Sequence, residues 1–276
     1  RSKNSSPVGT PSASTKYIPS NDQPRSGVYW VMCFSKTMCS LLLTLPGGLY
    51  VTGFGFPPEA AAAQVVDVDE GTFIVELDGR RMGTERFRIR RSGIGDNVRT
   101  IAQGTLEIVE GGLEQTVQSG ISTLGVGMSL DLYDVKVSAP SELSILLERR
   151  GDRMVSVTSS ETGVEEREYR QVQARTPTVL LDHFFAHHYF FITPYQAMGG
   201  TNLSVILPRP GGQSTGTLRM IGVEPLAFET VTVQAQRLEL RLDGAVHEIW
   251  LDGQNRVLQV RIRSQGYLAQ RITPPS

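Results

Sequence analysis

The segment LDHFFAHHYFF (residues 181–191) concentrates the side chains best suited to chemistry. It holds three of the four histidines, beside five phenylalanine or tyrosine rings. Imidazoles bind metals, transfer protons or line ligand cavities. On a helix, His183 and His187 lie side by side at the edge of an apolar arc, whereas His188 falls inside the arc and points away from them. This i, i+4 spacing is that of the first two zinc ligands in the motif H-E-x-x-H.

The zinc motif is incomplete. Phe184 follows the first histidine, where the motif places its glutamate base. The remaining histidine, His247, lies in an alternating strand pattern that groups it with the apolar Ile249. The chain contains no P-loop, and we expect no nucleophile elbow. The sequence therefore supports no metal, no cofactor and no catalytic residue.

The rest of the chain follows the period of β-strands. In TFIVELDGRRMGTERFRIRR (residues 72–91), apolar residues alternate with polar ones on both sides of Asp78-Gly79, which is the strongest local signal for a hairpin. Asp243-Gly244 and Asp252-Gly253 mark the turns beside two further strands near the C-terminus. We expect roughly ten to twelve strands in a mainly β fold. The predicted architecture is a single strongly curved antiparallel sheet, either a half-barrel or a barrel, covered by one helix near 178–197.

A curved sheet with one covering helix encloses an apolar interior that a lipid or another apolar small molecule can occupy. The expected function is therefore ligand binding without catalysis. Two alternatives stay open: a hydrolase-type enzyme that uses His183 or His187 with a carboxylate brought near by the fold, and a purely structural or interaction β domain with a filled core. The residues expected to contact a ligand are Phe184, His187, His188, Phe191, Phe87 and Trp250.

The N-terminal part differs in composition from the rest. Residues 1–26 are rich in Ser, Pro, Asn and Gly, so we predict a disordered or non-native extension. Residues 27–63 combine a lysine, an apolar run and the small residues of EAAAAQ, which is typical of a signal peptide. The predicted β domain spans 64–276, and we expect it to be exported to the periplasm or the outer envelope. Both cysteines, Cys33 and Cys39, precede it.

The charge balance limits the choice of partners. A formal net charge of -1, with 20% charged residues, excludes the basic excess of a nucleic-acid-binding protein. Arg86, Arg88 and Arg90, together with Arg261 and Arg263, form a basic stripe on alternating strands. This stripe either contacts a membrane surface or pairs with acidic residues of neighbouring strands. The sequence does not indicate an oligomeric state.

Three stretches together carry a family resemblance: GTFIVELDGRRMGTERFRIRR near the start, LLDHFFAHHYFF in the middle and EIWLDGQNRVLQVRI near the end. With them the chain resembles a group of uncharacterised bacterial envelope proteins, over roughly Gly71 to Ile272. That group is expected to form β half-barrels similar to the lipoprotein-carrier and lipoprotein-localisation fold. The resemblance implies an exported protein and a concave face that, in the carrier families, holds acyl chains.

Overall fold

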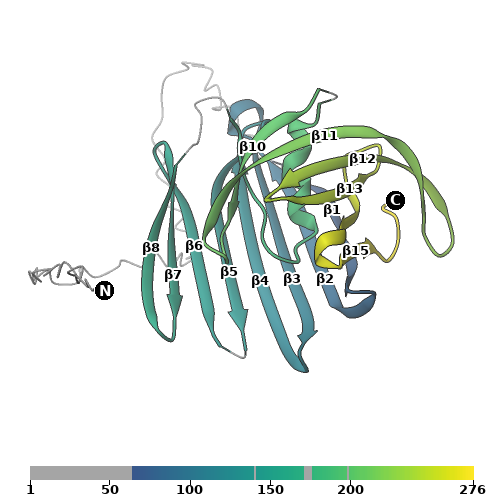
Figure 1. The fold of residues 1–276 in the computed structure, drawn as a ribbon. Coiled ribbons are helices and arrows are strands. Elements are labelled where there is room, and N and C mark those ends of the chain that lie inside the picture. The colour runs from purple at the N-terminus through teal and green to yellow at the C-terminus, as the bar shows by residue number, and fades with distance from the viewer. Residues whose placement is uncertain (1–63, 140, 171–175, 198) are drawn as a thin grey trace, which may run out of the picture. The chain divides into compact units, whose positions relative to one another are not determined.

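The computed structural model describes residues 64–139, 141–170, 176–197 and 199–276, which form a mainly β structure (Figure 1). All fifteen strands belong to one sheet, in the order β8 to β1 followed by β15 to β9. Neighbouring strands are antiparallel except β9 and β10, which are parallel. The prediction of one mainly antiparallel β sheet is confirmed, with more strands than expected. Within the described residues, no ladder of hydrogen bonds joins β8 to β9, so the sheet is not closed into a barrel.

The strands and helices follow one another along the chain with short connections. The strands are β1 (Val66–Leu77), β2 (Arg80–Ser92), β3 (Arg99–Glu110), β4 (Leu113–Leu124), β5 (Ser129–Ser138), β6 (Leu143–Arg150), β7 (Arg153–Ser160), β8 (Gly163–Arg170), β9 (Thr178–Leu180), β10 (Thr201–Leu207), β11 (Gly212–Ala227), β12 (Thr232–Leu242), β13 (Ala245–Leu251), β14 (Val257–Ile262) and β15 (Tyr267–Arg271). Three 3-10 helices accompany them in the described part of the chain: η1 (Gly95–Asn97), η2 (His187–Tyr195) and η3 (Arg263–Gln265).

The predicted hairpin turns are present where Asp-Gly pairs connect strands. Asp78 and Gly79 have φ angles of 51° and 74°, and Asp243 and Gly244 have 50° and 78°. Two successive positive φ angles match the twist of the flanking strands, which is why Asp-Gly suits these positions. The third Asp-Gly pair lies in a longer connection, in which Asn255 has the positive φ.

Two contacts join strands near the start of the sheet order to segments near its end, without a ladder of hydrogen bonds. The Tyr133 hydroxyl on β5 donates to Asp182 Oδ2 at 2.6 Å, just after β9. Arg167 on β8 donates to the carbonyl of Gly211, in the turn between β10 and β11. Side chains and turns, rather than strand pairing, therefore connect these two parts of the sheet.

The helix expected near 178–197 is shorter and of another type. Thr178–Leu180 form strand β9, which pairs with residues 204–206 of β10. Phe184 then has a φ of 64°, in the left-handed region that no right-handed helix contains. As a result, η2 begins only at His187 and is a 3-10 helix. His183 precedes it, so the i, i+4 pairing of His183 with His187 is not realised.

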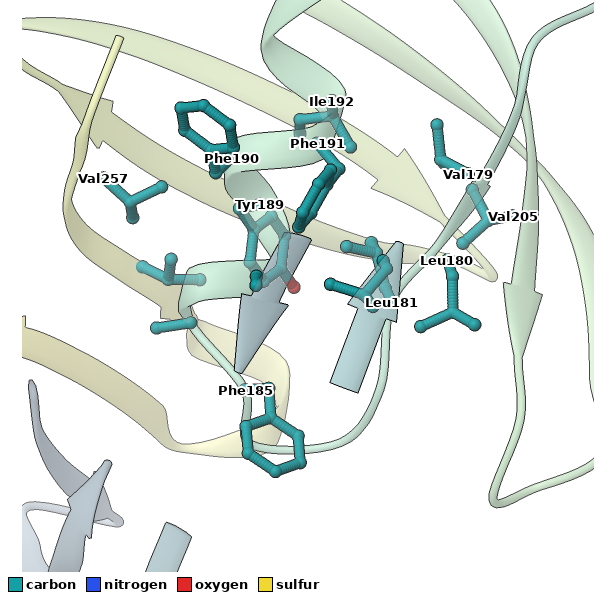
Figure 2. Packing of buried hydrophobic residues seen from close by; sticks show 14 of the residues in the cluster. Val179, Leu180, Leu181, Phe185, Tyr189, Phe190, Phe191, Ile192, Val205 and Val257 are labelled. Carbon is teal, nitrogen blue, oxygen red and sulfur yellow. The ribbon is translucent and has the colours of Figure 1, made fainter. Parts of the chain in front are cut away.

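The main core lies around η2. Residues 187–193 are all buried, and the η2 side chains Phe190, Phe191 and Ile192 belong to the main apolar cluster. Figure 2 shows these side chains near Val179, Leu180, Leu181, Val205 and Val257. The helix touches β2 through Glu85 and β13 through His247. It therefore contacts strands on both sides of the β1–β15 pair in the sheet order.

A second, smaller apolar cluster lies on the opposite face of β13. Alternation along that strand places His247, Ile249 and Leu251 toward the main core and Trp250 away from it. Trp250 packs there with Leu226, Ala235 and Leu258. Its indole N–H donates to Glu224 at 2.6 Å.

Candidate functional site

The Glu85 carboxylate is the central polar group beneath the histidine segment. Its Oε1 lies 2.5 Å from His187 Nδ1, and both side chains are completely buried. The same carboxylate accepts the backbone N–H groups of Ala186 at 2.7 Å and of His187 at 3.1 Å. A helix start leaves such N–H groups without partners within the helix. Glu85 therefore satisfies the first turn of η2 from a neighbouring strand.

Two glycines make room for this polar layer. Phe87 on β2 pairs in register with Gly71 on β1 and Gly104 on β3. A Cβ at Gly104 would lie 2.4 Å from the His187 ring, and one at Gly71 would lie 3.1 Å from the guanidinium of Arg271. Phe87 thus has an imidazole stacked at 5.6 Å and a guanidinium at 5.0 Å from its ring centroid. Because glycine has no side chain, the His187 ring fits over Gly104 and the Arg271 guanidinium fits over Gly71.

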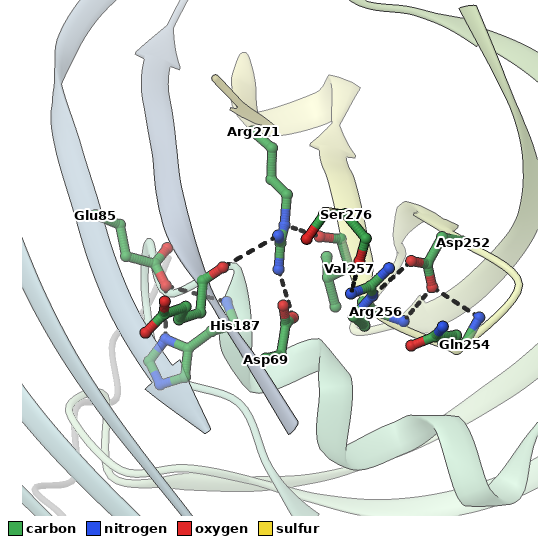
Figure 3. A network of polar contacts seen from close by, with 10 residues as sticks. Asp69, Glu85, His187, Asp252, Gln254, Arg256, Val257, Arg271 and Ser276 are labelled. Carbon is green, nitrogen blue, oxygen red and sulfur yellow. Dashed lines mark hydrogen bonds and ion pairs between the residues drawn. The ribbon is translucent and has the colours of Figure 1, made fainter. Parts of the chain in front are cut away.

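Arg271 fills the second of these spaces. Its guanidinium donates to Asp69, to the carbonyl of Val257 at 2.7 Å and to the carbonyl of Glu70 at 3.3 Å (Figure 3). Burial raises the pKa of the Asp69 carboxyl, and the nearby Arg271 charge opposes that effect. The pair joins β1, β15 and the start of β14. We regard it as structural because it is nearly sealed from solvent.

Asp182 organises the other side of the histidine segment. It accepts the Tyr133 hydroxyl at 2.6 Å and the Arg209 Nε–H at 2.9 Å, and its side chain is fully buried. Its own backbone N–H donates to His188 Nδ1 at 3.2 Å. Burial, with smaller electrostatic contributions from His187 and Arg209, lowers the pKa of His188 well below its usual value. His188 is therefore neutral at ordinary pH.

The hydrogen bonds define the tautomers of the neighbouring histidines. His188 accepts an N–H at Nδ1, so its single proton is on Nε2. His187 donates from Nδ1 to the Glu85 carboxylate. Both Nε2 atoms are buried without a hydrogen-bond partner, and the rings are 4.5 Å apart in a T-shaped contact. A metal would need a lone pair on each Nε2, and His188 has a proton there. The expectation that His188 points away from His187 is wrong.

A cavity of about 180 Å³ adjoins this segment. Its apolar wall includes Phe184, Phe185, Leu207, Ile262 and Tyr267, and its polar lining includes Asp182, His183, Asp243, His247 and Gln265. Typical pockets for drug-sized ligands have about 300–1,000 Å³, whereas an apolar cavity of about 150 Å³ holds a benzene ring. The cavity therefore has room for one ring or a short chain segment.

One of the two histidines that line the cavity, His247, contacts a tyrosine. His247 Nδ1 lies 2.6 Å from the hydroxyl oxygen of Tyr189, which also lines the cavity. Burial lowers the pKa of His247 to about 4 and raises that of Tyr189 above its usual value. Both groups are therefore uncharged at neutral pH. Together they place a hydrogen-bonding pair beside an otherwise largely apolar wall.

The structure separates the residues expected to contact a ligand. His187, His188, Phe191 and Phe87 lie together in the main core, all of them buried. Among the six, Phe184 alone lines the 180 Å³ cavity. Trp250 lies in the second cluster, on the other face of the sheet.

A nucleophile-elbow pattern is present after all. Residues 212–216 read GQSTG and match G-x-S-x-G, although we expected no such motif. The segment lies within β11, where Ser214 pairs in register with Val205 of β10. An elbow requires a sharp turn from a strand into a helix. The residues before and after Ser214 in the chain also belong to β11, so Ser214 does not occupy an elbow.

The arginines of the basic stripe are paired with acidic residues. Arg86 contacts Glu107 at 2.5 Å, Arg88 contacts Asp67 at 2.7 Å, and Arg90 also approaches Asp67. Arg263 contacts Glu248 at 2.8 Å, whereas Arg261 lies over the Trp250 ring at 5.5 Å. These ion pairs match the alternative in which the arginines pair with acidic residues of neighbouring strands.

Several residues of the site were not identified from the sequence. Glu85 occupies the same strand face as Phe87 and Ile89, so an acidic residue in an apolar alternation was the available signal. Asp182 stands directly before the histidines but has no comparable pattern. Its partners Tyr133 and Arg209 come from distant strands and turns.

Comparison of the chain with protein-family models, curated proteins and solved structures finds no match. Within the part of the chain that the structure describes, no helix is long and apolar enough to cross a membrane. In the same residues, no three or more His, Cys, Asp or Glu side chains are placed to hold a metal ion. The predicted extension at 1–26 and signal peptide at 27–63 lie outside the described residues.

Proposed function

We propose that this protein is a non-enzymatic, exported bacterial envelope protein that binds a small apolar ligand in the cavity beside residues 181–189. The observation that carries the proposal is the 180 Å³ space with its largely apolar wall. Two larger hollows, of about 670 and 430 Å³, are lined mostly by polar side chains. The cavity beside residues 181–189 is more enclosed than either hollow, so an apolar ligand bound in it is withdrawn further from water.

The proposal keeps the half-barrel architecture expected from the resemblance to carrier-like proteins. The contacts of Tyr133 with Asp182 and of Arg167 with Gly211 support it, because they bring segments from distant parts of the sheet order together. The ligand is smaller than a whole lipid. A cavity of this volume takes one ring or the end of a single acyl chain.

The hydrolase alternative has one observation in its favour. A carboxylate, Glu85, lies within hydrogen-bond distance of His187. Catalysis also requires that substrate reach the imidazole, and the side chains of both residues have no exposed surface. The pair satisfies backbone N–H groups in the core, which is a structural use. Ligand binding is therefore the better supported function.

Membrane-surface contact through the arginine stripe has less support than the cavity. Arg86, Arg88 and Arg90 are each close to a carboxylate, which reduces the positive potential available to anionic headgroups.

A filling substitution tests the cavity. Ala245 lines it, whereas the next residue, Val246, points to the exposed side of β13. We expect the full chain to bind alkylbenzenes or n-alkyl compounds by titration calorimetry and native mass spectrometry. Ala245→Leu should abolish that binding, and Val246→Leu should leave it unchanged. Failure of every tested ligand to bind, or wild-type binding by Ala245→Leu, would contradict the proposed site.

A second experiment tests export. The full chain, tagged at its C-terminus and expressed in a Gram-negative bacterium, is expected in the periplasmic or outer-envelope fraction. A protein found only in the cytoplasmic fraction would refute this part of the proposal.

A further inference from the structure

The hydrogen-bonding pair on the cavity wall restricts the ligand's chemistry. His247 Nδ1 and the Tyr189 hydroxyl share one hydrogen bond of 2.6 Å. If the tyrosine donates, His247 has its proton on Nε2 and offers a donor. If the imidazole donates from Nδ1, its Nε2 offers a lone pair and the tyrosine proton needs another acceptor. A hydroxyl group on the ligand fits both arrangements, because it donates and accepts.

The charges around the cavity restrict the ligand further. Among the lining residues, Asp182 and Asp243 are acidic, and there is no lysine or arginine. Arg209, the residue before the lining Pro210, is paired with Asp182 and also donates to the carbonyl of His183. A ligand carboxylate would therefore lose its hydration without gaining a lysine or arginine as a partner, which is costly.

We infer that the cavity is selective for an uncharged alcohol or phenol of one-ring or short-chain size, with its hydroxyl at His247, and that it excludes the corresponding carboxylate. This inference rests on the proposed ligand-binding function. It adds the polar chemistry of the ligand and names His247 as the residue that selects for it.

Three molecules with one skeleton test the inference: p-cresol, toluene and p-toluate, each titrated into the full chain at neutral pH. We expect p-cresol to bind at least about tenfold more tightly than p-toluate, and more tightly than toluene. The inference is overturned if p-toluate binds as tightly as p-cresol. If none of the three binds, and neither octanol nor octanoate does, the proposed ligand-binding function itself fails.

A substitution tests the assigned residue. His247→Phe keeps a ring on the wall but removes both nitrogens, so the preference for p-cresol over toluene should fall to about one. The preference is a ratio measured within one variant, so a lower folded fraction does not change it. Val246→Leu, on the other face of β13, should keep the wild-type ratio. An unchanged ratio in His247→Phe would overturn the assignment, and if this variant does not fold, the wild-type series still decides the ligand class.

Discussion

The carboxylate of Glu85 and the imidazole of His187 are joined by a hydrogen bond of 2.5 Å, from Oε1 to Nδ1, and neither side chain is exposed. The same carboxylate accepts the backbone N–H groups of Ala186 and His187. One acidic residue on β2 therefore sets where η2 begins and how its first imidazole is oriented. A buried group with three hydrogen bonds is costly to remove, because each lost bond leaves a donor unsatisfied.

Glu85→Ala should lower the free energy of unfolding by about 3 kcal/mol. The substitution leaves two backbone N–H groups and the His187 Nδ1–H in the core without hydrogen-bond acceptors. Urea denaturation followed by circular dichroism measures the change. Glu107→Ala is the matched control, since Glu107 is an exposed acidic residue on the neighbouring strand β3 that pairs with Arg86 of β2. The control should cost less than about 1 kcal/mol. Equal losses in the two variants would contradict the central role of Glu85.

Gly104→Ala should destabilise the protein by about 1–3 kcal/mol, because the new methyl group overlaps the His187 ring. Gly253→Ala, where a Cβ meets no atom within 4 Å, should change stability by no more than about 0.5 kcal/mol. A double-mutant cycle with His187→Ala provides the decisive measurement. The cost of the added methyl should shrink once the ring is removed, and an unchanged cost would show that the ring is not the obstacle.

Arg271→Lys should cost about 2–4 kcal/mol, although the charge is conserved. The guanidinium donates to Asp69 and to two backbone carbonyls and lies over the Phe87 ring. An ammonium group lacks the planar set of donors that makes these contacts at the same time. Thermal unfolding monitored by near-ultraviolet circular dichroism reports the loss. Arg86→Lys, at an exposed pair, should be nearly neutral. A neutral Arg271→Lys would mean that charge alone matters at this position.

Acidification should destabilise the fold through two buried histidines. Burial lowers the pKa of His188 well below 6.5 and that of His247 to about 4. At a pH between the lowered pKa of either histidine and 6.5, the unfolded chain binds more protons than the folded one. Stability is therefore complete above pH about 6.5 and falls as the pH approaches 4.

The His247 share of this effect is about 3 kcal/mol, because the pKa falls from 6.5 to about 4. It is measured by urea denaturation at several pH values for the wild type and for His247→Gln. The wild type should lose more stability than the variant between pH 6.5 and 4, and parallel curves would exclude a contribution from His247.

Local patterns in the sequence were sufficient for the hairpins and the strand faces. Asp78-Gly79 and Asp243-Gly244 adopt the positive φ angles that their turns require, because turn chemistry depends on adjacent residues. The inward face of His247 also followed from strand alternation, and His188 is buried as expected although the α-helix assumed for it does not form. In both cases the relevant neighbours lie within a few positions along the chain.

Contacts between distant residues were beyond such patterns. The late start of η2 depends on the pairing of Thr178–Leu180 with β10 and on the Glu85 carboxylate, about a hundred residues earlier in the chain. The separation of Trp250 from Phe184 and His187 depends on which side of β13 each apolar cluster occupies.

The sequence by itself determined a chain of antiparallel strands with Asp-Gly turns and one buried aromatic and histidine segment, because periodicity and turn preference are local properties. Only the tertiary structure decided that Glu85 accepts a hydrogen bond from His187, that Gly71 and Gly104 make room beside Phe87, and that the cavity lies next to His247. These features depend on strand register and on buried polar groups finding partners far along the chain, and no local pattern encodes either.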